Sequence, residues 1–152
     1  MTEMPRAKHQ HRDFRAPRSP DRFGGAMIEF VLALPLLLML TFGVVDYGYF
    51  FFAKNSLVSA AQIGVRAAVT ESATNSSVTS AISASLTASG FGNCSYTVTT
   101  NPTDVSTASK GAAVTVTVTA TWSNVGVHTL PTFLGGIDSS KQVIGTAVMI
   151  KE

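Results

Sequence analysis

The sequence predicts an α+β chain with a long N-terminal transmembrane helix that continues outside the membrane. A short second helix and a small antiparallel sheet of three or four strands follow it. Two features of the 152-residue chain indicate this fold: a long apolar run near the N-terminus, and a change of hydrophobic period from helical to two after about residue 94. With 45% hydrophobic and 13% charged residues, the chain has room for one membrane helix and one small domain.

The apolar run has the length of a membrane span. No charged residue occurs from Phe30 to Val45, and Gly25 to Ile28 extend the run past a single acid, Glu29. At about 1.5 Å per residue, a helix from Gly25 to Val45 spans the hydrocarbon core of roughly 30 Å. Up to Phe23 the chain carries six basic and three acidic residues. The positive-inside rule therefore places the N-terminus in the cytoplasm and the C-terminal domain outside, in a single-pass protein of the cytoplasmic (inner) membrane in contact with lipid.

The helix is expected to continue beyond the membrane to about residue 70. The aromatic cluster 47–52 is of the kind enriched at a membrane interface and marks the outer one. Two faces then follow helical spacing: a polar one with Asn55, Ser59, Gln62 and Arg66, and a small apolar one with Leu57, Ala61, Gly64 or Val65, and Ala68. The small face predicts packing against either the protein's own sheet or a neighbouring subunit. We favour the sheet for this outer half and subunit packing for the membrane half.

The second half of the chain contains the remaining elements. Val78, Ile82 and Leu86 recur every four residues and predict a helix that ends at Gly90. Alternation of apolar residues with Ser or Thr predicts strands from Cys94 to about Thr99, from Val114 to Trp122, and from Lys141 to Ile150. Segments 101–111 and 124–136 are expected to be loops. A single cysteine, Cys94, cannot form an intramolecular disulfide, and it is either a small buried residue or a reactive thiol.

A glycine precedes the acid of the apolar run by five residues. In Gly24-Gly25-Ala26-Met27-Ile28-Glu29 a basic leader comes before the glycines and an apolar helix follows. This arrangement resembles the site cut by prepilin peptidases, with the scissile bond between Gly24 and Gly25. Residues 1–24 would then be a disordered leader that is removed.

Further motifs follow along the helix and at the end of the chain: the run from Glu29 and Phe30 through Pro35 to Leu37, Phe42-Gly43 and Asp46-Tyr47-Gly48, Ala60-Ala61 and Gly64-Val65-Arg66-Ala67-Ala68, and the closing residues 147–152. Together these motifs resemble the TadE-like pseudopilins of tight-adherence (Tad) pilus systems. The chain departs from the family pattern at Val65, where alanine is usual, and at Asp46, where glutamate is commoner. The resemblance implies a pilin-like fold with a transmembrane helix at 25–46, a helical extension at 47–70 and a small outer domain at 71–152.

The resemblance also implies roles for particular residues. Gly24 and Gly25 would flank the cut, whereas Glu29, Phe30 and Pro35 would serve recognition and assembly. Helix packing would use Gly43, Asp46, Gly48, Ala61, Gly64 and Arg66. The implied partners are a prepilin peptidase, other Tad pilins or pseudopilins, and the inner-membrane assembly platform.

Glu29 and Pro35 each have two interpretations. Cleavage after Gly24 would create an α-amino group on Gly25, with which Glu29 of a neighbouring subunit could pair. Glu29 could instead be an acid that sits at headgroup depth. Pro35 removes one helical hydrogen bond, and it is either a harmless bend or a flexible point that eases extraction from the bilayer.

The sequence contains no pattern typical of a catalytic or cofactor site. His9 and His11 lie in the leader, and His128 has no Cys, His or acid at metal-ligand spacing. No phosphate-binding loop or nucleophile elbow is found. We therefore expect a non-enzymatic protein with no cofactor, metal, small-molecule substrate or nucleic-acid partner.

The favoured interpretation is a minor pilin or pseudopilin, a membrane precursor used to assemble a pilus for surface attachment. A second is an uncleaved single-pass envelope protein whose outer domain is an adhesive or binding module. A third is a secreted protein with an ordinary signal peptide. It is disfavoured because the apolar run is long and no A-x-A-like site follows it.

Overall fold

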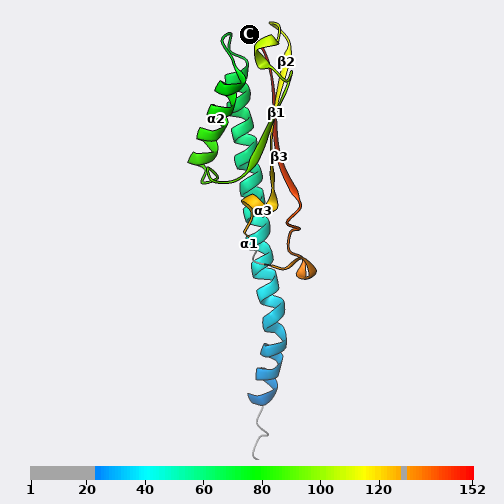
Figure 1. Cartoon of the computed structure of the whole chain (residues 1–152). Helices are drawn as coiled ribbons and strands as arrows, with labels where there is room; N and C mark the ends of the chain where they lie inside the picture. Colours follow the sequence, from blue (N-terminus) through cyan, green and yellow to red (C-terminus); the bar gives the residue numbers. More distant parts are fainter. Residues whose placement is uncertain (1–22, 128–129) are drawn as a thin grey trace, which may run out of the picture. The chain divides into compact units, whose positions relative to one another are not determined.

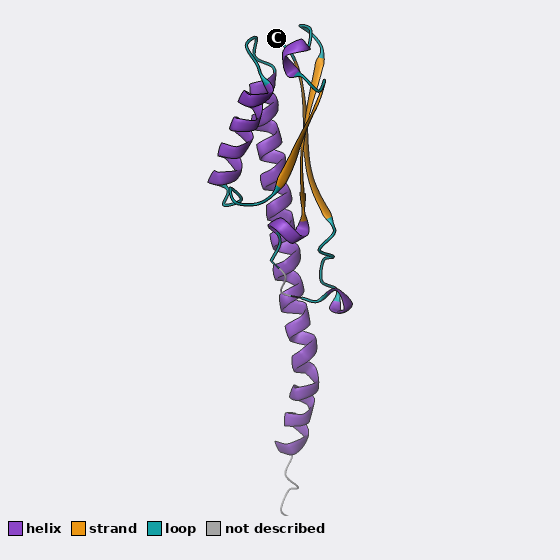
Figure 2. Cartoon of the chain, viewed as in Figure 1, coloured by secondary structure: helices purple, strands orange, loops and turns teal. Residues whose placement is uncertain are grey.

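The computed structural model describes residues 23–127 and 130–152. It has the predicted α+β class: a long helix α1 (Phe23–Ala68), a short helix α2 (Asn75–Ala88) and a three-stranded antiparallel sheet. The strands are β1 (Tyr96–Asn101), β2 (Ala113–Thr121) and β3 (Gln142–Ile150), in the order β1-β2-β3 (Figures 1 and 2). A one-turn helix α3 (Trp122–Val125) and the 3₁₀ turns η1 (Val105–Thr107) and η2 (Thr132–Leu134) lie in the connections.

Helix α2 begins and ends at residues suited to those positions. The Thr74 hydroxyl accepts a hydrogen bond from the Ser77 N–H, and the Ser77 hydroxyl accepts one from the Thr74 N–H, which together form a capping box. The helix ends at Ala88, and Gly90 follows with a φ of 85°, a left-handed conformation that glycine adopts without strain. The predicted stripe of Val78, Ile82 and Leu86 is buried.

The outer part of α1 packs with its small apolar face inward, as expected for the sheet-packing alternative. Leu57, Ala61, Gly64, Val65 and Ala68 are buried, whereas Asn55, Ser59, Gln62 and Arg66 are exposed. A Cβ atom at Gly64 would lie 2.7 Å from Ile82 of α2 and 3.3 Å from Val116 of β2, so three elements meet there. The buried apolar residues form one core, whose largest fully buried side chains are Trp122, Leu57, Ile82, Leu86 and several valines.

Two predicted strand ends were wrong. Cys94 lies before β1 because its N–H donates to the Phe91 carbonyl in the turn after α2, and it is half-buried against the core rather than fully buried. Trp122 begins α3 instead of ending β2. Its N–H donates to the Lys141 carbonyl (2.7 Å), and its own carbonyl accepts from the Gly126 N–H (2.7 Å), which turns the chain.

A buried lysine near the C-terminus ties β3 to the connection between β1 and β2. Lys151 is 7% exposed, and its Nζ donates to the carbonyl oxygen of Val105 at 2.8 Å. Its backbone N–H and C=O pair with the Ala112 C=O and the Gly111 N–H, each at 2.9 Å. The segment that sequence patterning predicted only as a polar loop therefore contains a core residue, Val105, and a charged partner for its carbonyl.

Replacing this lysine is expected to destabilise the fold. Lys151→Met keeps the apolar stem but leaves the buried Val105 carbonyl without its donor, which costs about 1–3 kcal/mol of unfolding free energy. Denaturant unfolding in detergent micelles measures the change. Lys110→Met, which alters an exposed lysine beside the same connection, is the matched control. Equal stability of the two variants would contradict the role assigned to Lys151.

Candidate functional site: the apolar surface of the long helix

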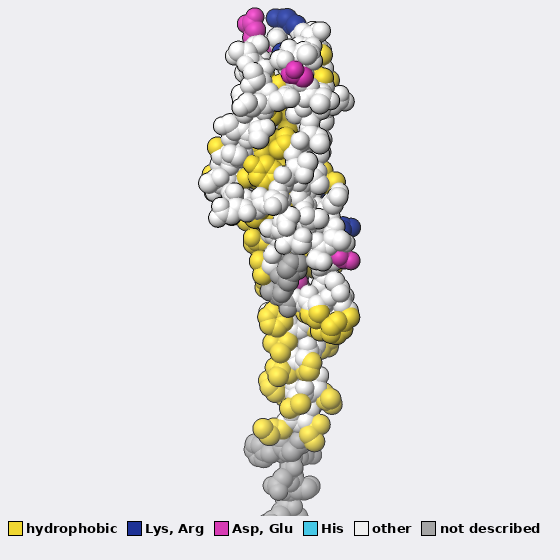
Figure 3. Space-filling view, viewed as in Figure 1, with side chains coloured by type: hydrophobic (Ala, Val, Ile, Leu, Met, Phe, Trp, Pro, Cys, Tyr) yellow, Lys and Arg dark blue, Asp and Glu magenta, His cyan; other side chains and the backbone are white. Residues whose placement is uncertain are grey.

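Large apolar side chains cover the first half of α1 and remain exposed. Met27 and Leu32 are each 75% exposed and Leu40 is 66% exposed. Figure 3 shows hydrophobic side chains gathered along this part of the helix on the face drawn. The helix from Gly25 to Ala68 is long and apolar enough to cross a membrane, and no residue of its most apolar stretch is buried. This helix therefore fits a single-pass membrane protein, since the core helix of a soluble protein would be mostly covered.

The residues expected to serve cleavage and assembly lie on this helix. Gly24 and Gly25 are within α1, whose described residues begin at Phe23. Glu29, Phe30 and Pro35 are exposed, and the helix continues through Pro35.

The six residues expected to serve helix packing fall into two groups. Asp46, Ala61 and Gly64 are buried within the chain, and Gly43 is half-buried beside Leu130. Gly48 and Arg66 face outward: a Cβ atom at Gly48 would meet nothing within 4 Å, and Arg66 is exposed. The outward pair is thus available to another molecule, whereas the inward four stabilise this fold.

Asp46 is the most buried acid that the structure describes. It is 1% exposed, and its Oδ2 accepts a hydrogen bond from the Leu130 N–H at 3.2 Å. The two residues are 84 positions apart in the chain. Asp46 therefore fastens the β2–β3 connection to α1 at the end of the apolar run.

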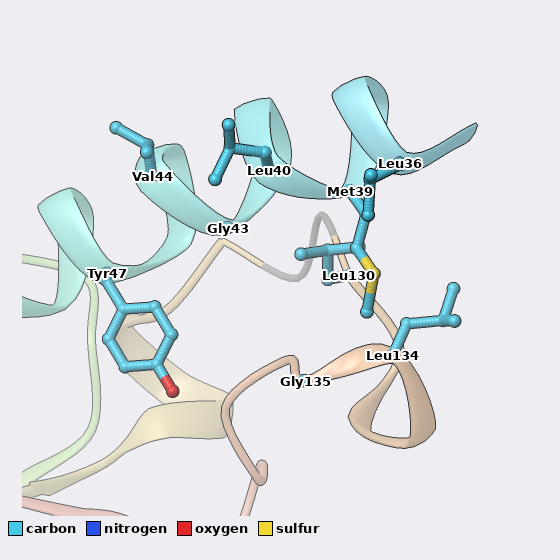
Figure 4. Close-up of a pocket in the computed structure, with 9 residues that line it drawn as sticks. All are labelled: Leu36, Met39, Leu40, Gly43, Val44, Tyr47, Leu130, Leu134 and Gly135. Carbon is cyan, nitrogen blue, oxygen red and sulfur yellow. The ribbon is translucent and has the colours of Figure 1, made fainter. Parts of the chain in front are cut away.

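An apolar groove lies beside Asp46 between α1 and the β2–β3 connection. It has a volume of about 430 Å³. Its lining residues are Leu36, Met39, Leu40, Gly43, Val44, Tyr47, Leu130, Leu134 and Gly135. Figure 4 shows Met39 and Leu130 directed into the space between the helix and the connection. Patterning missed Leu130 and Leu134 as site residues, although the lack of charge from Gly126 to Ile137 was a usable signal.

The aromatic side chains after Asp46 fall into two groups: some pack on the core, and others are exposed. Phe50 and Tyr49 pack on Trp122, with ring centroids 5.4 Å and 6.2 Å away. Tyr47 and Phe51 are 51% and 64% exposed. Only part of the cluster is therefore available to a membrane interface, because the rest contacts the core.

Two acids outside α1, Asp138 and Asp104, accept hydrogen bonds within turns. The Ser140 N–H and hydroxyl both donate to Asp138, and these hydrogen bonds lower the pKa of its carboxyl group. The pKa of Asp104 is lowered in the same way by the hydroxyl and N–H of Ser106. Within residues 23–127 and 130–152, no three His, Cys, Asp or Glu side chains are grouped to hold a metal ion, while His9, His11 and His128 lie outside these ranges.

Comparison with known proteins gives one match. The model of a family described as "TadE-like protein" matches residues 24–66, less than a third of the 152-residue chain. No curated protein and no solved structure matches the chain significantly. The match ends at Arg66, so the similarity of residues 147–152 stays a prediction. The resemblance to the TadE-like family is thereby confirmed for the segment of α1 that contains Gly24, Glu29 and Asp46.

Proposed function

We propose that the chain is a non-enzymatic TadE-like minor pilin or pseudopilin. It is made as a membrane precursor, trimmed by a prepilin peptidase and used with other Tad pilins and the assembly platform to build a tight-adherence pilus. The family match over residues 24–66 supports this proposal, because the matched segment contains the cleavage motif and nearly all of α1.

One structural observation carries the proposal: α1 is covered by the chain's own fold over its outer part and uncovered over its apolar part. Ala53, Leu57 and Ala60 are at most 2% exposed, whereas Leu32 and Leu36 are more than 70% exposed. Such a helix needs lipid or other helices as its surroundings. In the bilayer lipid covers it, and in a fibre the equivalent helices of neighbouring subunits take the place of lipid.

Cleavage between Gly24 and Gly25 requires the backbone there to become extended. Each glycine destabilises a helix by about 1 kcal/mol relative to alanine, and the two glycines are adjacent in α1. Local unwinding at this pair therefore costs little, and the absence of side chains lets the peptidase approach the backbone closely.

Cleavage also supplies a partner for Glu29. The new α-amino group on Gly25 is cationic or partly so near neutral pH. An exposed Glu29 on one subunit can pair with this group on a neighbour when the helices stack. Removing one partner from a buried ion pair leaves an unpaired buried charge, which costs free energy. The pair therefore mainly favours the helix register in which both charges are paired.

Glu29→Gln tests this mechanism. The variant should be trimmed but recovered with its partner pilins at a level at least about tenfold lower, since an unpaired buried charge costs several kcal/mol. The measurement is co-purification of the partners from detergent-solubilised membranes. Glu71→Gln, at an exposed acid beyond the end of α1, is the matched control. Unchanged recovery of Glu29→Gln would rule out pairing as the assembly device.

A second candidate function is an uncleaved envelope protein with an adhesive outer domain. The outward face of the sheet favours it: Thr97 and Thr99 of β1 are exposed, and so are Ile144 and Val148 of β3. Hydroxyl groups beside apolar side chains form a surface suited to binding. Retention of residues 1–24 in the membrane-bound protein would favour this function over the first.

A further inference from the structure

The β2–β3 connection contains an uncharged turn whose apolar side chains point outward. No Asp, Glu, Lys or Arg occurs from Gly126 to Ile137. Phe133 at the centre of η2 is 83% exposed, and Leu134 beside it is 38% exposed. A phenylalanine side chain that is this exposed, in a turn without charged residues, indicates a surface that contacts lipid or another apolar molecule.

This turn lies beside the apolar run of α1 and not beside the water-exposed end of the fold. Leu130 approaches the helix at Gly43, where a Cβ atom would be 3.9 Å from its Cδ1. Leu134 lines the same groove as Leu36 and Met39. Leu36 precedes Val45, the end of the predicted span, by nine residues, or about 14 Å of helix. The turn is therefore level with helix residues that belong to the outer half of the span.

Part of the backbone of the turn is hydrogen-bonded within the protein, which lowers the cost of placing it in lipid. The Leu134 and Gly136 N–H groups donate to the Pro131 carbonyl, at 2.9 Å and 3.2 Å. The Gly135 N–H donates to the Thr132 carbonyl at 3.1 Å, and Gly135 has a φ of 93° that reverses the chain. Pro131 has no N–H to satisfy.

Polar groups return where the turn ends. Asp46 accepts the Leu130 N–H at one side of the turn. At the other side Asp138 is exposed and holds Ser140 through two hydrogen bonds of 2.8 Å. A carboxylate thus lies near each end of the apolar turn.

We infer that the turn from Leu130 to Gly135 inserts into the outer leaflet beside α1, with lipid acyl chains covering Phe133 and filling the groove between the turn and the helix. This inference rests on the proposed membrane span of α1. The protein then contacts the hydrocarbon through two elements, a spanning helix and a turn that enters the outer leaflet. The boundary between the membrane and the outer domain is consequently not a single residue near Asp46, because residues 130–135 from the outer domain also enter the bilayer.

Spin-label accessibility tests the insertion. The full chain carrying Cys94→Ala and Phe133→Cys is labelled with a nitroxide and reconstituted into vesicles of phosphatidylcholine and phosphatidylglycerol. Collision rates are measured with oxygen, which partitions into lipid, and with a neutral nickel chelate, which stays in water. Leu32→Cys serves as the reference for the span, and Ser140→Cys, at an exposed residue beyond Asp138, as the reference for water.

Insertion predicts that the label at position 133 resembles the label at position 32. Its collision rate with the nickel chelate should be about tenfold lower than at position 140, because a polar complex is excluded from hydrocarbon. Its oxygen collision rate should stay high. A label at 133 that is open to nickel while the label at 32 is protected would overturn the insertion and leave the span intact.

Two other outcomes also contradict the inference. Nickel access at both 133 and 32 would refute the membrane span and, with it, the proposed function. Protection of position 133 from both oxygen and nickel would mean that protein covers the turn. In that case a second copy of the chain, rather than lipid, would occupy the groove.

Discussion

A Gly145→Val variant is expected to lose the packing of the sheet against α1. Gly145 lies on β3 where the strand crosses the helix, and a Cβ atom there would lie 2.3 Å from the Leu57 carbonyl carbon and 2.5 Å from the Val58 nitrogen. These are backbone atoms of α1 and cannot rotate aside. Strand and helix must therefore separate, at a cost of about 3 kcal/mol or more of unfolding free energy.

Near-ultraviolet circular dichroism in detergent micelles measures this loss, since Trp122 is fully buried in the core. Thr146→Val is the matched control: it introduces the same side chain at the next residue, which is exposed, and it removes only a surface hydrogen bond of 3.3 Å to the Thr117 hydroxyl. The control should unfold within about 0.5 kcal/mol of the parent protein. A Gly145→Val protein as stable as Thr146→Val would contradict the close crossing of β3 and α1.

Gly24→Val is expected to accumulate as the full-length precursor when the peptidase is present. The branched side chain adds bulk on the backbone that the peptidase must reach. Processing should be lost almost completely, as judged by the ratio of precursor to mature protein on an immunoblot. Gly48→Val changes another glycine of the same helix, where a Cβ atom meets nothing within 4 Å, and should be trimmed normally. Normal trimming of Gly24→Val would contradict the cleavage site.

Local periodicity was sufficient to predict most elements of this fold. The faces of α1 were predicted correctly because buried and exposed residues repeat at helical spacing from Asn55 to Ala68. Strand β2 was predicted because its valines alternate with threonines, and Val114, Val116 and Val118 are fully buried. Such patterns record directly which side of an element is covered.

Features that depend on residues far apart in the chain were not predictable in this way. The Asp46–Leu130 hydrogen bond joins residues 84 positions apart, and the close crossing of Gly145 with Leu57 joins two elements through backbone atoms. Neither contact corresponds to a periodic pattern of residues in the sequence. The turn that contains Leu134 had a local signal, the lack of charge from Gly126 to Ile137, but its position beside Leu36 and Met39 was not predictable.

The cleavage and assembly residues differ from these structural ones in how they could be predicted. Gly24, Gly25 and Glu29 were proposed from a short motif, and the family match covers that motif. Their roles depend on a peptidase and on neighbouring subunits, so the fold of a single chain does not test them.

The intact mass and N-terminal sequence of the protein from cells, with and without the prepilin peptidase, distinguish a trimmed pilin from an uncleaved membrane anchor. Trimming yields a mature chain that begins at Gly25 when the peptidase is present and a chain that retains residues 1–24 when it is absent. A membrane-bound protein that still begins at Met1 in the presence of the peptidase, or one that begins near Gly43 beyond most of the apolar run, would contradict it.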